Sequence, residues 1–71
     1  MAWIALRYRG EEYTAKQLID ISRRFLEGSG CAFQGYEIYD DCDLLVITGT
    51  DEAGTESSFE LSLDELGDYL G

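Results

Sequence analysis

Residues 44–47 read Leu-Leu-Val-Ile, a continuous apolar run that precedes the alternating segment 55–61. Runs of aliphatic and β-branched residues are typical of a central strand that is covered on both faces, whereas edge strands alternate. We therefore predict that this run is the central strand of a sheet and that both of its faces are buried.

Strand-like residues continue on both sides of this run. An acidic cluster at 40–43 (Asp-Asp-Cys-Asp) divides residues 31–50 into the two arms of a hairpin. A second turn at 51–54 (Asp-Glu-Ala-Gly) leads into 55–61. In that segment Ser57, Phe59 and Leu61 alternate with Glu56, Ser58 and Glu60. The pattern predicts a half-exposed strand and a sheet that is mostly antiparallel.

The N-terminal third predicts a strand followed by a helix. Residues 2–9 alternate as a half-buried strand does, and Gly10, Glu11 and Glu12 break the pattern. Residues 14–17 (Thr-Ala-Lys-Gln) have the form of a capping box, so a helix should begin near Ala15. Its predicted buried face consists of Ala15, Leu18, Ile19, Ser22, Phe25 and Leu26, with Ile21 at the margin.

The C-terminus predicts a second helix. Residues 62–65 (Ser-Leu-Asp-Glu) resemble another capping box, and Leu63, Leu66 and Leu70 follow at helical spacing. The order is then β-α-β-β-β-α, which indicates an α+β fold in a single domain of residues 1–71. With 45% apolar residues and nine aromatic residues, the chain is too rich in core-forming side chains for an intrinsically disordered protein.

Charge is distributed very unevenly. The formal net charge is −10. Residues 1–24 contain all five basic residues and three acids, for a net charge of +2, whereas residues 25–71 contain twelve acids and no base, for a net charge of −12. Such a segment repels itself in the compact state, since no local cation offsets it. It is either a solvated surface that favours solubility or a negative field directed at a basic partner.

Several chemistries are disfavoured. The chain has no histidine, so the commonest general base and the commonest zinc ligand are missing. No phosphate-binding glycine motif is present, and the acids at 40–43 lack the spacing of a calcium-binding loop. Cys31 and Cys42 lack CxxC spacing and are predicted to be buried free thiols, with a disulfide or a reactive thiol as the alternative. We expect no catalytic site, no metal and no cofactor.

The localisation and the oligomeric state follow from the same features. No segment is long and apolar enough to cross a bilayer, and no signal peptide is recognisable, so a cytoplasmic protein is expected. Mutual repulsion between copies favours a monomer. Direct binding to nucleic acid is disfavoured because the field has the wrong sign. Four arginines either form a small basic face or balance acids within the fold; they are Arg7, Arg9, Arg23 and Arg24.

Regularly spaced carboxylates can occupy a site that another protein uses for phosphates, because arginine and lysine bind both groups. Glu56 and Glu60 form one predicted row, which Asp51 and Glu52 continue at the turn. A neighbouring row is predicted from Glu37, Asp40, Asp41 and Asp43. These eight acids are the predicted partner-binding residues, and Trp3, Tyr36 and Tyr39 are candidate aromatic anchors.

With one compact domain, strong acidity from residue 25 onward and no catalytic motif, the chain resembles the small acidic inhibitors encoded by phages and other mobile elements, including anti-CRISPR proteins and DNA mimics. The resemblance implies that it blocks the nucleic-acid-binding surface of a host defence complex or a similar enzyme, in the host cytoplasm. The alternatives are an antitoxin-like or regulatory module with a mainly apolar interface, and a small enzyme or metal protein.

Overall fold

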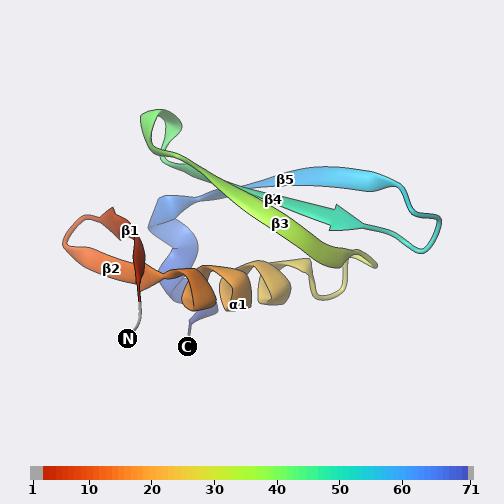
Figure 1. The fold of residues 1–71 in the computed structure, drawn as a ribbon, viewed down its shortest axis with the longest axis horizontal. Coiled ribbons are helices and arrows are strands. Elements are labelled where there is room, and N and C mark those ends of the chain that lie inside the picture. The colour runs from red at the N-terminus through yellow and green to blue at the C-terminus, as the bar shows by residue number, and fades with distance from the viewer. Residues whose placement is uncertain (1–2, 71) are drawn as a thin grey trace.

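The computed structural model describes residues 3–70, so the predicted start of the first strand at Ala2 lies outside the described residues. Two antiparallel sheets accompany one α-helix (Figure 1), which confirms an α+β fold. The strands are β1 (Ile4–Tyr8), β2 (Glu11–Thr14), β3 (Ala32–Tyr39), β4 (Leu44–Thr50) and β5 (Glu56–Ser62). The helix is α1 (Ala15–Leu26), and two 3₁₀ helices are η1 (Asp40–Cys42) and η2 (Leu63–Tyr69).

The larger sheet has the order β3-β4-β5, so β4 is central, as predicted. Burial along β4 alternates: Leu45 and Ile47 are fully buried, whereas Leu44 and Val46 are only half-buried. The prediction that both faces of this strand are covered is therefore wrong. In Figure 1, α1 and η2 lie on the same side of the sheet, and no described element covers the opposite side, which we call the outer face.

The core lies between the inner face of this sheet and α1. Across the sheet, Ile38 and Leu61 flank Leu45, and Tyr36 and Phe59 flank Ile47. From the helix side, Leu18, Ile21 and Leu26 are buried in the same cluster, and the Phe25 ring meets the Phe59 ring edge-on at 6.0 Å between centroids. Ile21 is thus fully buried rather than marginal, and the predicted face was wrong in including Ala15, which is exposed.

Both ends of α1 form as the sequence indicates. The Thr14 hydroxyl accepts a hydrogen bond from the Gln17 backbone N–H at 3.1 Å, and the Gln17 side-chain oxygen accepts one from the Thr14 N–H at 2.8 Å. This reciprocal pair is a capping box, which satisfies two otherwise unpaired donors. After the helix, Gly28 has φ +84, the left-handed conformation that ends many helices.

The segment after Tyr8 contains a strand that the sequence prediction missed. Glu11–Thr14 pairs with β1 through a two-residue loop of Arg9 and Gly10, which have φ values of 51 and 83. Positive φ at both central residues matches the twist of a tight hairpin. Leu6 and Tyr13 are partners across this ribbon, and both are buried, so their burial against the core supports the pairing.

The C-terminal segment forms a 3₁₀ helix rather than the predicted α-helix. The Ser62 hydroxyl caps it by accepting from the Asp64 N–H at 3.3 Å. Leu63 and Leu66 are buried, and their spacing of three residues suits three residues per turn. Leu70 is 38% exposed, so it does not complete the predicted helical face.

Candidate protein-binding face

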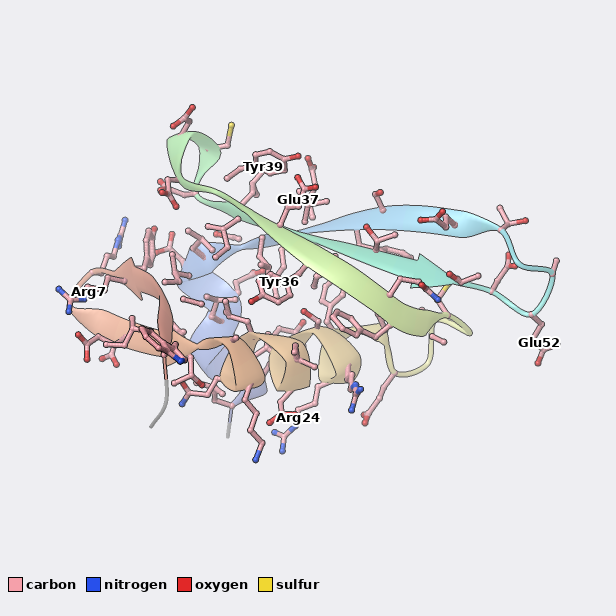
Figure 2. The ribbon with its side chains drawn as sticks, in the orientation of Figure 1. Arg7, Arg24, Tyr36, Glu37, Tyr39 and Glu52 are labelled. Carbon is pink, nitrogen blue, oxygen red and sulfur yellow. The ribbon has the colours of Figure 1, made fainter. Side chains whose placement is uncertain are left out.

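Three of the eight predicted acids meet on the outer face. Glu37 on β3 and Glu60 on β5 both pair with Val46, from opposite sides, and Glu56 pairs with Thr50. Strands in a sheet are about 4.8 Å apart, so Glu37 and Glu60 are roughly 10 Å apart across β4. Figure 2 shows Glu37 on the side of the sheet opposite α1. Glu37 therefore lies on one side of the central strand, and Glu56 and Glu60 lie on the other.

The other predicted acids lie in the turns at the two ends of the sheet. Asp40 and Asp41 belong to η1, and Asp43 follows it in the left-handed conformation at φ 54. Glu52 extends from the β4–β5 turn at the opposite end (Figure 2). Six residue steps of about 3.4 Å along β4 put these ends roughly 20 Å apart. The structure thus separates these acids into two tips instead of gathering them into one cluster.

Asp51 differs from the other predicted acids because it organises its own turn. Its Oδ1 accepts hydrogen bonds from the backbone N–H groups of Ala53 and Thr55, each at 2.9 Å. Aspartate commonly fixes turns by this kind of local bond. Asp51 is half-buried, whereas Glu52 beside it is exposed. We conclude that the carboxylate of Asp51 holds the turn, whereas the carboxylate of Glu52 faces solvent.

The basic residues leave the outer face unneutralised. Among residues 3–70 the ion pairs are Arg7 with Glu12 at 3.0 Å and Arg9 with Asp64 at 3.3 Å, and neither includes a predicted site acid. Arg24 donates instead to the Tyr69 carbonyl at 3.0 Å. In Figure 2, Arg7 and Arg24 point away from the outer face. Among the described residues, the arginines therefore pair with one acid of the base-free segment 25–71, Asp64, and with none of the eight predicted partner-binding acids.

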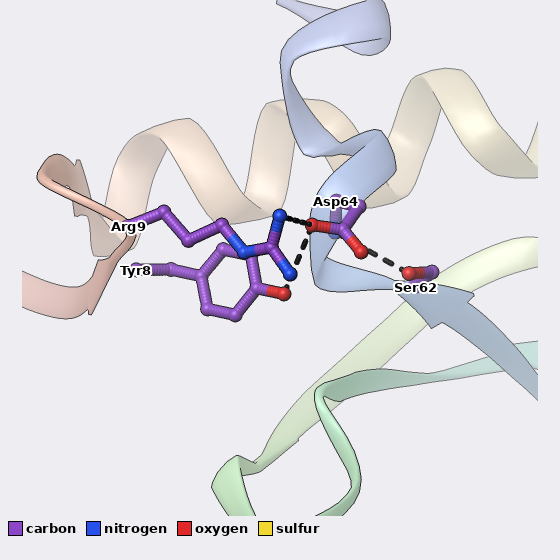
Figure 3. Close-up of polar contacts among 4 residues, drawn as sticks. All are labelled: Tyr8, Arg9, Ser62 and Asp64. Atoms are coloured by element: carbon purple, nitrogen blue, oxygen red, sulfur yellow. Dashed lines mark hydrogen bonds and ion pairs between the residues drawn. The ribbon is translucent and has the colours of Figure 1, made fainter.

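Asp64 joins the β1–β2 hairpin to η2 (Figure 3). Its Oδ1 accepts a hydrogen bond from the Tyr8 hydroxyl at 2.9 Å and lies 3.3 Å from Nη1 of Arg9. Desolvation, together with the hydrogen bond to this carboxylate, raises the pKa of Tyr8 above its ordinary value. The two contacts connect residues 56 and 55 positions apart in the sequence, so no local sequence pattern could predict them.

Of the three candidate aromatic anchors, two are exposed and one packs against the core. Tyr39 is 45% exposed, and its hydroxyl donates to Oε2 of Glu37 at 2.8 Å. Trp3 is 82% exposed. Tyr36 lies between the sheet and α1 (Figure 2) and packs against the core, so proposing it as an exposed anchor was wrong. The reason is the pleat, since Tyr36 pairs with the inward-facing Ile47.

The contact between Tyr39 and Glu37 gives a testable titration. The hydrogen bond and the nearby negative charge raise the pKa of Tyr39 above its ordinary value. Because the folded-state pKa is the higher one, the stabilisation is fully present below the unfolded pKa of about 10 and is lost as the pH rises through the folded pKa. We expect Glu37→Gln to lower the pKa of Tyr39, as measured by NMR of its ring.

Glu56→Gln is the control for that titration. It removes an equal charge from the same face, but residue 56 makes no hydrogen bond to Tyr39. The pKa of Tyr39 should then change little. Equal shifts in both variants would show that the general field of the face, rather than the contact with Glu37, raises this pKa.

Other kinds of site receive no support from the described residues. Within residues 3–70, no three His, Cys, Asp or Glu side chains gather as metal ligands would. Two surface hollows, of about 380 and 320 Å³, lie beside Cys31 and around the β1–β2 loop, and neither includes a predicted site acid. Cys31 and Cys42 are free, as predicted, but they are half-buried and exposed respectively rather than buried. No helix in this part of the chain has the length and apolar character to span a membrane.

Sequence reasoning missed the apolar part of the outer face. Leu44, Val46 and Thr48 point outward from β4, between the two acidic rows. The signal was present in the continuous run at 44–47, but it was interpreted as burial within this chain. A continuous apolar run that carries no charge on either face is the signal that could have revealed this patch.

Comparisons with protein families, characterised proteins and solved structures found no match to this chain. Its function is therefore inferred from the placement of its own residues.

Proposed function

We propose that this domain is a non-enzymatic inhibitor whose acidic outer face and acidic tips occupy the basic nucleic-acid-binding groove of a partner protein or ribonucleoprotein complex. One observation carries the proposal: the predicted site acids lie on one sheet face and its two ends, with no cation paired to them among residues 3–70. In its most specific form, the proposal is that the domain acts as an anti-CRISPR protein. It would act as a monomer, in the host cytoplasm.

Arginine explains how such a surface competes with nucleic acid. A guanidinium binds carboxylate and phosphate with the same bidentate geometry. Glu56 and Glu60 lie four residues apart on one strand, a distance of about 13 Å, and Glu37 lies roughly 10 Å across the sheet. Long arginine and lysine side chains can reach over such gaps. The same carboxylates repel phosphates, so the domain should bind the protein and not the nucleic acid.

A second candidate function is a regulatory or antitoxin-like module with a mainly apolar interface. It is favoured by two observations: Leu44 and Val46 are uncovered on the outer face, and Trp3 is 82% exposed. Salt dependence separates the two functions, because exposed charge contacts are screened within a few ångströms in molar salt. A complex that keeps its affinity in 1 M NaCl would favour the apolar module.

The proposal is tested by capturing the partner and then challenging it with nucleic acid. The domain is immobilised, a partner is captured from the cell that encodes the chain, and the purified complex is titrated with duplex DNA, single-stranded DNA and RNA. We expect at least one of these to displace the domain competitively and added salt to weaken the complex. Failure of all three to compete would contradict the proposed function.

Charge reversal locates the contact. The double variant Glu37→Lys/Glu60→Lys should lose at least about tenfold in affinity, since it places two cations against a basic groove. The matched control is Glu11→Lys/Asp20→Lys, which alters the net charge of −10 by the same four units at exposed positions on β2 and α1. Equal losses would show that only net charge matters, and no loss in either would remove the outer face from the interface.

A further inference from the structure

The central strand of the outer face is more apolar than the water-facing side of a strand usually is. Antiparallel sheets that face solvent on one side usually alternate apolar and polar residues. On β4 the outward positions are Leu44, Val46, Thr48 and Thr50, so the water-facing side of the central strand carries two aliphatic residues and no charge. Tyr39 extends this apolar row at the β3 edge, beside Leu44. Nothing in residues 3–70 covers it.

Charge flanks the apolar row on both sides. Glu37 and Glu60 pair with Val46 from β3 and β5, so the order across the sheet is carboxylate, aliphatic side chain, carboxylate. Tyr39 donates its hydroxyl to Glu37 at 2.8 Å, which holds that carboxylate beside the row. An apolar centre within a polar border is the usual anatomy of a protein interface.

We propose that this row is the centre of the docking surface and that its occupant is a protein segment in which basic side chains flank an aliphatic one. The inference rests on the proposed function and deepens it, by assigning the contact to Leu44 and Val46, with Glu37 and Glu60 on either side of Val46. The aliphatic contact holds the partner, and the two carboxylates set its position by pairing with its cations.

Charge complementarity selects this occupant over two others. A second copy of the chain, packed face to face, brings glutamates against glutamates with no described cation nearby to separate them. Nucleic acid presents phosphates to the same carboxylates and is repelled. A protein segment with basic side chains on both sides of an aliphatic one matches both the charges and the apolar row.

The size of the face agrees with this role. Between the axes of the outer strands it measures roughly 10 by 20 Å, which is smaller than the about 800 Å² that each partner buries in a standard interface. The acidic tips at Asp40, Asp41 and Glu52 extend it at both ends. The apolar row is therefore the centre of a larger contact, and the tips are its border.

Two peptides test the surface without knowledge of the natural partner. The first is acetyl-Arg-Ser-Leu-Ser-Arg-amide, which when extended presents Arg, Leu and Arg on one side; the second replaces Leu with Ser at equal charge. Binding is followed by NMR of the Leu44 and Val46 methyl groups. We expect the Leu peptide to bind at least about threefold tighter, and this difference to persist in 0.5 M NaCl, where charge contacts are screened.

Val46→Lys places a cation between Glu37 and Glu60, where the partner's own cations are expected. It should fold, since cross-strand pairs of opposite charge are favourable, and should abolish the preference for the Leu peptide. Ala5→Lys makes the same charge change at an exposed position on β1 and should retain the preference within about twofold. If Val46→Lys fails to fold, Val46→Thr keeps the branched shape and should lower the preference for the Leu peptide.

Several outcomes overturn this inference. Equal affinity for both peptides, or shifts confined to the amides of the two acidic tips, would show that only charge is recognised. The result is also separable from the proposed function. If Val46→Lys keeps the affinity for the captured partner while Glu37→Lys/Glu60→Lys loses it, the acidic inhibitor stands and the apolar centre fails. If nucleic acid never competes but the Leu peptide still binds at Val46, the apolar centre stands and the acidic inhibitor fails.

Discussion

Replacing Leu45 with alanine is expected to destabilise the fold by about 2–5 kcal/mol, the usual cost of removing a fully buried leucine side chain. Leu45 is 0% exposed and lies between Ile38 and Leu61 on the inner face of the central strand. At about 0.05–0.15 kcal/mol per residue, a domain of this size has only about 4–10 kcal/mol of stability in total. Urea denaturation followed by circular dichroism should show the midpoint fall sharply or the transition disappear.

Leu44→Ala is the matched control, because it makes the same change one residue away on the other face of β4. Leu44 is half-buried and has no described element above it, so its removal should cost roughly 1 kcal/mol. Equal costs at the two positions would contradict the finding that this sheet is covered on one face only.

The sequence predicted correctly those elements that are determined by interactions between residues close together in the chain. The capping box at Thr14 and Gln17 sets the start of α1 through bonds between residues three apart, so the sequence contains all that is needed. The alternation in β5 likewise predicts which side chains face solvent, because the pleat has a period of two. The central place of residues 44–47 was also predicted correctly, because continuous apolar runs are typical of central strands.

Features that depend on distant contacts could not be predicted in this way. β2 carries two glutamates and a single buried residue, Tyr13, whose burial requires the core formed by other segments. η2 is fixed by the burial of Leu63 and Leu66 and by the capping Ser62, and a capping motif does not distinguish an α-helix from a 3₁₀ helix. In both cases tertiary packing decided between local alternatives of similar energy.

The candidate site shows the same division. That Glu56 and Glu60 share a face follows from their spacing, but their alignment with Glu37 depends on the registers of two strand pairs. The use of Asp51 within its own turn became visible only from its two backbone bonds. The sequence therefore predicted an acidic surface, and the strand registers determined which acids lie side by side on it.

Repulsion on the outer face connects the stability of the domain with its proposed function. Unpaired like charges oppose the compact state, and they persist in this chain because its bases are held on the hairpin and the helix. A partner that supplies cations to this face removes the repulsion as it binds. Partner binding should therefore stabilise the domain more at low salt than at high salt, where the repulsion is already screened.

Gly49→Ala is expected to destabilise the fold by about 1–3 kcal/mol, as overpacking of a filled interior does. Gly49 is buried on the inner face of β4, where the end of α1 and the start of β3 meet it. A methyl group there would lie 2.9 Å from Cβ of Cys31, 3.2 Å from the Ala32 carbonyl oxygen and 3.3 Å from Cδ1 of Leu26. Since two of these atoms are backbone or attached directly to it, the clash requires the chain itself to move.

Gly35→Ala provides the comparison within the same sheet. An added Cβ at Gly35 meets nothing within 4 Å, and Gly35 pairs with Thr48 on the neighbouring strand. Alanine there reduces the freedom of the unfolded chain and should be neutral or stabilising by about 0.4–1 kcal/mol. Gly49→Ala should therefore lower the thermal midpoint, whereas Gly35→Ala should leave it unchanged or raise it. Equal midpoints would mean that the end of α1 and the start of β3 do not pack closely against Gly49. The inner face would then be packed more loosely than its buried residues indicate.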